Sequence, residues 1–333
     1  MNPKKMLFAV TTGFGTAKNG VDLGLAMRAL GNNVEFFDVD WKPAHLRLTP
    51  KPLRRNWWQP AYVRAMNQAL VERVRREHPA VVFFLSGFQI TAETIAAIRA
   101  LGAKTVAYWV DDPVDDRGFE KAGLYDLFLT NDRQSLPRYH QAGVKSVRHF
   151  PSAVNEKLFF PIVPRPEMSD VGFVGTHSPY RESILQQLLD YDLKVYGPGW
   201  KKNSAMPARC VDDEVFGERT NMVYNGSRIN LNIHTWFGAG SAMNLRLFEV
   251  PCAGAFLLTD WVEEINGSFV ENEHIACYRT VTELKEKLDY FLSHEAERAH
   301  IAAAGRVHVL ASHTYRSRAL IFDQWCDQLL GTA

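Results

Sequence analysis

The sequence predicts an α/β protein built from two doubly wound parallel sheets, and three observations indicate this architecture. Short apolar runs alternate with segments that repeat apolar residues every three or four positions, as in β-α-β units. The runs are continuously apolar, which is typical of strands covered on both faces. A proline-rich stretch, residues 151–168, separates one such series from a second, and 333 residues is the length of two domains.

The first series occupies residues 1–150 and forms an N-terminal domain. Its expected strands are 6–12, 34–40, 80–86, 105–110, 125–130 and 146–150. Residues 151–168 read as a linker, and a C-terminal domain over 169–313 follows. Its expected strands are 170–176, 193–197, 228–234, 255–260 and 274–280. Residues 314–333 are expected to form a C-terminal helix, which could pack back on the N-terminal domain.

Composition and charge exclude several classes of protein. Lys plus Arg (38) nearly cancels Asp plus Glu (37), so a general polyanion binder, and with it a nucleic-acid partner, is disfavoured. The stretch Lys42–Arg76 is basic and rich in aromatic residues, and it is either an acidic or sugar acceptor surface or a solvated helix face with a basic loop. The four cysteines form no CxxC pair, which fits reduced thiols. No apolar run reaches the roughly 18 residues of a membrane span, and we expect a soluble, cytoplasmic protein.

The first strand is followed by a glycine-rich turn, TTGFGTAKNG (11–20). Gly13 and Gly15 permit close approach of the backbone to a ligand, and the helix that follows favours an anion at its N-terminus. Lys18 stands where a dinucleotide-binding fingerprint would place its third glycine. The turn is therefore either an N-terminal ligand loop or a strand-to-helix connection that simply needs glycines.

Two strand ends of the C-terminal domain carry candidate binding residues. In VGFVGTHSPYRESIL (171–185), Gly175 and Thr176 leave the strand end open and Arg181 lies early in the helix, which suits a diphosphate. The alternative is an ordinary turn with a surface arginine. In VYGPGW (195–200), Tyr196 and Gly197 lead into a turn that either forms a wall for a flat base, with Trp200 stacking, or is a plain turn.

A longer stretch, NLNIHTWFGAGSAMNLRLFEVPCAGAFLLTDW (230–261), combines a strand, a glycine-rich loop and a helix that opens near Asn244. His234 ends the strand and could hydrogen-bond a phosphate. Arg246 and Glu249 are three residues apart, hence on one helix face, among apolar neighbours. Buried charges need partners. Either the two form an ion pair, or Glu249 accepts hydrogen bonds from ribose hydroxyls while Arg246 binds a phosphate.

The run 244–260, NLRLFEVPCAGAFLLTD, resembles the signature of the CgeB-like branch of group 1 glycosyltransferases, and residues 283–319 are similar to that family's C-terminal end. The resemblance covers residues 170–325; over 1–150 it is stylistic, with YWVDDP (108–113) as its strongest part. It implies a GT-B fold, with two Rossmann-like domains facing a cleft. It also implies a nucleotide-diphosphate sugar in the C-terminal domain, an acceptor (glycan, protein or small molecule) in the N-terminal domain, and no essential metal or other cofactor.

Carried onto this chain, the resemblance assigns roles to the residues already singled out. Glu249 would hold the ribose of the donor. Gly175, Thr176 and Arg181 would face the diphosphate, and Arg246 would support it. Tyr196, Gly197, His234 and Asn244 complete the expected donor site.

Two points of mechanism stay open. Many family enzymes carry a second glutamate eight positions before the first, at what is here Ser241, so a retaining mechanism is not implied. Asp111 and Asp112 follow the strand TVAYWV and are either a catalytic base or two solvated turn carboxylates. The alternatives to a metal-independent glycosyltransferase are a non-catalytic nucleotide- or glycan-binding protein and a nucleic-acid-modifying glycosyltransferase.

Overall fold

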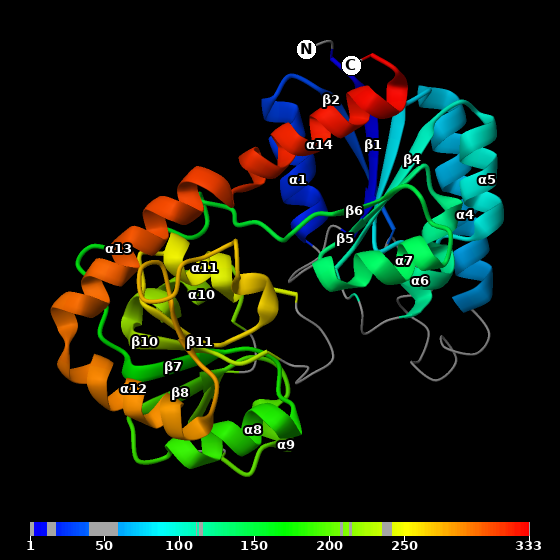
Figure 1. Cartoon of the computed structure of the whole chain (residues 1–333). Helices are drawn as coiled ribbons and strands as arrows, with labels where there is room; N and C mark the ends of the chain where they lie inside the picture. The colour runs from blue at the N-terminus through cyan, green and yellow to red at the C-terminus, as the bar shows by residue number, and fades with distance from the viewer. Residues whose placement is uncertain are drawn as a thin grey trace. The chain divides into compact units, whose positions relative to one another are not determined.

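The structure, a computed structural model, describes residues 3–11, 18–39, 59–110, 112, 116–206, 209–212, 215–234 and 242–332. The chain forms two compact units. Unit 1 combines Met1–Pro151 with Tyr315–Ala333, and unit 2 is Ser152–Thr314. Figure 1 shows a sheet flanked by helices in each unit.

Unit 1 contains a six-stranded sheet with the order β2-β1-β3-β4-β5-β6. All of its strand pairs are parallel, so the carboxyl ends of the strands meet at one edge. In register, Phe8 lies opposite Phe36 on one side and Phe83 on the other. The strands are β1 (Lys5–Val10), β2 (Asn33–Asp38), β3 (Val81–Leu85), β4 (Lys104–Trp109), β5 (Leu127–Thr130) and β6 (Val147–His149).

Helices cover both faces of this sheet because successive residues of each strand point to opposite faces. Along β1, Phe8 belongs to the apolar cluster that contains Leu23 and Phe322, whereas Leu7 belongs to the cluster with Met66. The Phe322 ring lies 6.4 Å from that of Phe8. The helices are α1 (Lys18–Ala29), α4 (Gln59–Glu77), α5 (Ala92–Ala100), α6 (Asp116–Lys121), α7 (Leu136–Gln141) and α14 (Tyr315–Leu330).

A buried ionic network joins the two ends of the chain within unit 1. The Lys4 ammonium contacts the carboxylates of Asp323 and Asp327 at 2.9 Å each. The Asn32 amide donates to Asp323 as well, at 2.8 Å. Since Lys4 and Asp323 are almost fully buried, this network ties α14 to the start of the first strand.

Unit 2 repeats the design with the strand order β12-β11-β10-β7-β8-β9, again with parallel pairs throughout. The strands are β7 (Ser169–Val174), β8 (Leu193–Tyr196), β9 (Cys210–Asp212), β10 (Ser227–Asn232), β11 (Leu257–Asp260) and β12 (Ala276–Tyr278). The helices are α8 (Pro179–Leu185), α9 (Trp200–Asn203), α10 (Glu218–Gly226), α11 (Arg246–Cys252), α12 (Val281–Ser293) and α13 (Glu295–Ser312).

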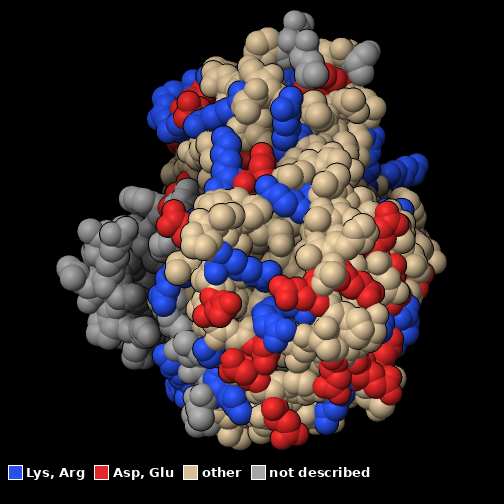
Figure 2. Space-filling view, turned by 90° about the vertical axis from the view of Figure 1, so that its left-hand side faces the viewer, with Lys and Arg blue, Asp and Glu red and all other residues tan. Residues whose placement is uncertain are grey.

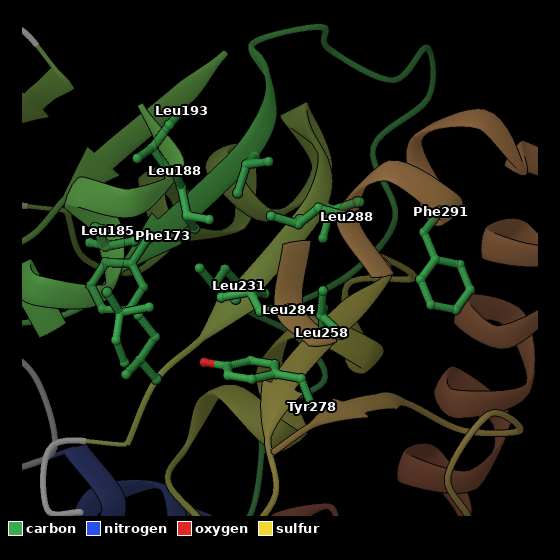
Figure 3. Close-up of a cluster of buried hydrophobic side chains, with 14 of the residues drawn as sticks. Phe173, Leu185, Leu188, Leu193, Leu231, Leu258, Tyr278, Leu284, Leu288 and Phe291 are labelled. Carbon is green, nitrogen blue, oxygen red and sulfur yellow. The ribbon is translucent and has the colours of Figure 1, made fainter. Parts of the chain in front are cut away.

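One face of the unit 2 sheet packs against α8, α9 and α12, and the other against α10 and α11. Figure 3 shows part of the first core, in which Phe173 and Leu185 lie on one side and Leu284 and Leu288 of α12 on the other. Ser178 caps α8 by accepting a hydrogen bond from the Arg181 amide, which starts this helix just after the strand end.

The proline-rich segment expected to be a linker packs on unit 2. Its residue Phe159 is buried in the second core. The side chains of Asn221 and Asn225 on α10 hydrogen-bond the backbone of Phe160 and Ile162. These contacts hold the segment along α10 and assign it to the second unit.

The two doubly wound parallel sheets confirm the predicted fold class. β9 and α10 were not anticipated. β9 has only three residues, and α10, ERTNMVYNG, lacks a clear apolar period. Among the residues that the structure describes, no helix is both long and apolar enough to cross a membrane.

Candidate functional site

The carboxyl edge of the unit 2 sheet brings together most of the residues singled out in its sequence. Gly175 and Thr176 follow β7, His234 lies two residues past β10, and Asp260 ends β11. Because β7, β10 and β11 are consecutive in the sheet, these positions are neighbours. The sequence analysis did not single out Asp260, although it is the last residue of the expected strand 255–260.

Two guanidinium groups converge on Gly175. A Cβ atom at this position would lie 3.2 Å from Nη1 of Arg246 and 3.3 Å from Nη1 of Arg181. Both guanidinium groups also lie over the Phe173 ring, at 5.7 and 5.5 Å from its centroid. Burial, reinforced by the Arg246 charge, lowers the pKa of Arg181 to about 9. Within the described ranges, neither arginine forms an ion pair with a carboxylate.

Hydrogen bonds fix both arginines in place. Arg181 donates from Nε to the Ile233 carbonyl at 3.0 Å and from Nη1 to the Thr176 carbonyl at 2.8 Å. Arg246 donates from Nε to Oδ1 of Asn232 at 2.7 Å, and Asn244 donates to the same oxygen at 2.9 Å. Asn232 was missed, and the signal was an asparagine inside the apolar strand RINLNIH. Among the described residues, the site thus holds two fixed cationic groups that form no ion pair with a carboxylate.

Glu249 lies one turn after Arg246 on α11 and is half-buried. Its Oε2 accepts a hydrogen bond from the Tyr224 hydroxyl at 2.8 Å. Burial raises the pKa of Glu249, while the Tyr224 hydrogen bond and the Arg246 charge oppose this effect. In the described part of the chain Arg246 and Glu249 do not form an ion pair with each other, so the ion-pair interpretation is wrong.

His234 is clamped by Asp260. The ring Nδ1 lies 2.7 Å from Oδ1 of Asp260, and the His234 backbone amide donates to Oδ2 at 2.9 Å. The residue is 7% exposed, and its Nε2 has no hydrogen-bond partner among the residues that the structure describes. The pair therefore orients a buried ring with one unused nitrogen.

The turn after β8 supports the Gly175 backbone. Gly197 adopts a φ of +126°, and a Cβ there would lie 2.4 Å from the Gly175 carbonyl oxygen. Trp200 is fully buried and donates from Nε1 to that same oxygen at 2.7 Å. Of the two interpretations of this turn, the one in which Trp200 stacks on a flat base is wrong, because its ring is packed inside the core. Tyr196 is also buried, and its hydroxyl has no hydrogen-bond partner within the ranges that the structure describes.

In unit 1, Asp112 lies just past β4 and is 5% exposed. The Thr130 hydroxyl donates to its Oδ2 at 2.6 Å. Burial raises the pKa of Asp112 above its ordinary value, although the Thr130 hydrogen bond acts in the opposite direction. The interpretation of Asp112 as a solvated turn carboxylate is therefore wrong. Its proposed role as a base stays a prediction.

Several predicted positions lie outside the described residues, namely Gly13, Gly15, Asp111, Ser241 and residues 42–58 of the basic stretch. Figure 2 shows basic and acidic side chains interspersed over the visible face. Within the ranges that the structure describes, no group of three or more His, Cys, Asp or Glu side chains is placed to hold a metal ion.

Comparisons with known proteins place this geometry in context. Residues 181–324 match a family described as "Glycosyl transferase-like". The spore protein CgeB of Bacillus subtilis (strain 168) is 22% identical over 263 residues, which cover 73% of this chain and 81% of CgeB. The matched family segment contains Arg181, Arg246 and Glu249.

Solved structures agree over the whole chain. Sucrose-phosphate synthase from Thermosynechococcus elongatus has a TM-score of 0.73 at 13% identity, with 100% of both chains covered. Anabaena Alr3699/HepE in complex with UDP and glucose has a TM-score of 0.65 at 10% identity, with 98% of this chain and 100% of that chain covered. The chain is therefore similar to the spore protein CgeB and, over residues 181–324, to the glycosyl transferase-like family, and it has the GT-B fold of these solved structures.

Proposed function

We propose that this enzyme transfers a glycosyl group from a nucleotide-diphosphate sugar to an acceptor hydroxyl, without an essential metal. The observation that carries the proposal is the convergence of Arg181 and Arg246 on Gly175. The buried Arg181 and the half-buried Arg246 carry like charges that repel each other, and the buried one is costly without an anion. A diphosphate at the Gly175 strand end would neutralise both guanidinium groups.

The remaining groups suit the rest of a nucleotide. Glu249 follows Arg246 by three residues, on the same face of α11. Since one of its oxygens accepts from Tyr224, the carboxylate is held in one orientation with its second oxygen available to ribose hydroxyls. The HepE complex with UDP and glucose is consistent with such a ligand in this fold.

Glycosyl transfer builds negative charge on the departing diphosphate. Preorganised cations stabilise that charge without reorganising during the reaction. The hydrogen bonds from Arg181 to Thr176 and Ile233 hold one guanidinium in place before the donor arrives. We expect the acceptor to bind unit 1. There the buried Asp112 remains our candidate for the base that takes the proton from the acceptor hydroxyl.

Thermal-shift measurements with UDP-, GDP-, TDP- and CMP-sugars test the donor assignment. A specific donor raises the melting temperature because it binds only the folded state. The shift should disappear in Glu249→Ala and persist in Glu286→Ala, which removes an exposed glutamate of α12. An unchanged shift in Glu249→Ala would refute the ribose assignment.

Folding of the variant needs its own control, because Glu249→Ala also removes the partner of Tyr224. Glu249→Gln keeps an acceptor for that hydroxyl but replaces one carboxylate oxygen with an amide donor. It should fold as the wild type and bind the donor more weakly. A non-catalytic binding protein would show the thermal shift yet release no nucleoside diphosphate from the donor in the presence of acceptors.

A further inference from the structure

The unused Nε2 of His234 is a second feature of the donor site. This atom is buried and has no hydrogen-bond partner in the described part of the chain, whereas Nδ1 on the opposite side of the ring is paired with Asp260. An unsatisfied buried polar atom destabilises the folded state, and such atoms are rare in native structures. The orientation of this ring therefore fits a ligand that supplies the missing partner.

The hydrogen bonds determine which partner Nε2 can accept. An ionised carboxylate only accepts hydrogen bonds, so Nδ1 carries the proton that it shares with Asp260. In the neutral ring Nε2 is then a bare lone pair. A phosphate oxygen of a diphosphate diester carries no proton and can pair with Nε2 only when the ring is protonated. A sugar hydroxyl could instead donate to the neutral ring.

The surroundings of His234 favour the phosphate. Arg181 donates from Nε to the carbonyl of Ile233, the residue directly before His234. Arg246 donates to Asn232, one residue earlier. Asp260 raises the pKa of the Tyr180 and Tyr278 hydroxyls, although burial contributes more. Among the residues that the structure describes, Asp260 contacts the ring itself, Arg181 and Arg246 bind the two residues before it, and Tyr180 and Tyr278 interact electrostatically with Asp260.

We infer that binding of the donor diphosphate is coupled to the uptake of one proton at Nε2 of His234, with Asp260 as the group that orients the ring. The proton comes from solvent, and the N–H that forms donates to a phosphate oxygen. The imidazolium adds a third cationic group to Arg181 and Arg246, and the proton returns to solvent when the nucleotide leaves. This inference rests on the proposed function and adds a pH dependence to the same site.

Calorimetric titration of the full chain tests it, with UDP-, GDP-, ADP- and TDP-glucose as probes. Their esterified diphosphates have no group that titrates near neutral pH, so any proton exchanged belongs to the protein. The tightest probe is titrated at about pH 8 in buffers of different ionisation enthalpy, which gives the number of protons taken up. We expect uptake approaching about one proton, and a Kd that weakens as pH rises, by up to about tenfold per pH unit.

Two variants separate this proton from the rest of the protein. His234→Gln offers a neutral N–H donor that does not titrate, so it should bind the probe with no proton uptake and with a Kd independent of pH. His300→Gln removes an exposed histidine of α13 and should behave as the wild type. Asp260→Asn leaves the ring without its carboxylate and should weaken binding most at high pH.

The outcomes distinguish the two levels of the proposal. If no sugar nucleotide binds the wild type, the proposed function fails and this inference fails with it. If a probe binds without proton uptake, or if His234→Gln retains the uptake, the proton coupling alone is overturned. If the wild type binds the probe without proton uptake and His234→Gln no longer binds it, Nε2 would be assigned to a sugar hydroxyl instead of the phosphate.

Discussion

Replacing Gly197 by alanine should destabilise unit 2 and weaken donor binding at the same time. The positive φ of +126° is strained for any residue with a Cβ, which costs about 1–2 kcal/mol. The new Cβ would also lie 2.4 Å from the Gly175 carbonyl oxygen, so the backbone must shift. Overpacking of this kind costs about 1–3 kcal/mol more. The expected loss in the free energy of unfolding is therefore about 2–5 kcal/mol.

Gly267 provides a matched control for this prediction. It has a φ of +79°, and a Cβ added there meets nothing within 4 Å. Gly267→Ala should therefore lose only the backbone contribution, about 1–2 kcal/mol, and should bind the donor as the wild type does. Urea unfolding measures both free energies, and calorimetry measures the donor Kd. Equal losses in the two variants would show that the contact between Gly197 and Gly175 does not constrain the site.

Two further predictions concern unit 1. Lys4→Met should destabilise the protein by about 3–5 kcal/mol in urea unfolding, because it leaves the buried Asp323 without its ammonium partner. The control Lys5→Met removes an exposed lysine and should have little effect. Similar losses in the two variants would contradict the stabilising role of Lys4. Asp112→Asn removes a carboxyl whose pKa is raised by burial, while the amide oxygen can still accept from Thr130. Since the folded state binds that proton more tightly, wild-type stability falls as pH rises from about 4 through the raised pKa, and the variant should avoid this loss. Urea unfolding across this range measures the difference, and a pH-independent difference would refute it; a lower kcat with unchanged donor Kd would support Asp112 as the base.

The sequence alone was enough to predict the sheets, because continuous apolar runs such as VVFFL have few other uses in a chain of this composition. It also indicated Arg181, Arg246 and Glu249, since charges among apolar residues need partners. The sequence could not indicate the hydrogen-bond partners of these site residues that lie on other strands. Asn232 and Asp260 act through contacts across the sheet, and Trp200 packs in the core, where its N–H donates to the Gly175 carbonyl. Such pairings depend on register and packing, which a linear pattern does not contain.

The discontinuity of unit 1 affects how the protein is made. Its sheet is complete by residue 151, yet α14, whose Phe322 packs on Phe8 and Phe83, is translated after the whole of unit 2. Throughout synthesis of unit 2, the nascent chain therefore lacks the helix that covers this part of the apolar surface. A ribosome that stops before residue 315, or a protease that removes α14, would leave this apolar surface exposed, and the resulting species would be prone to aggregate or to bind chaperones.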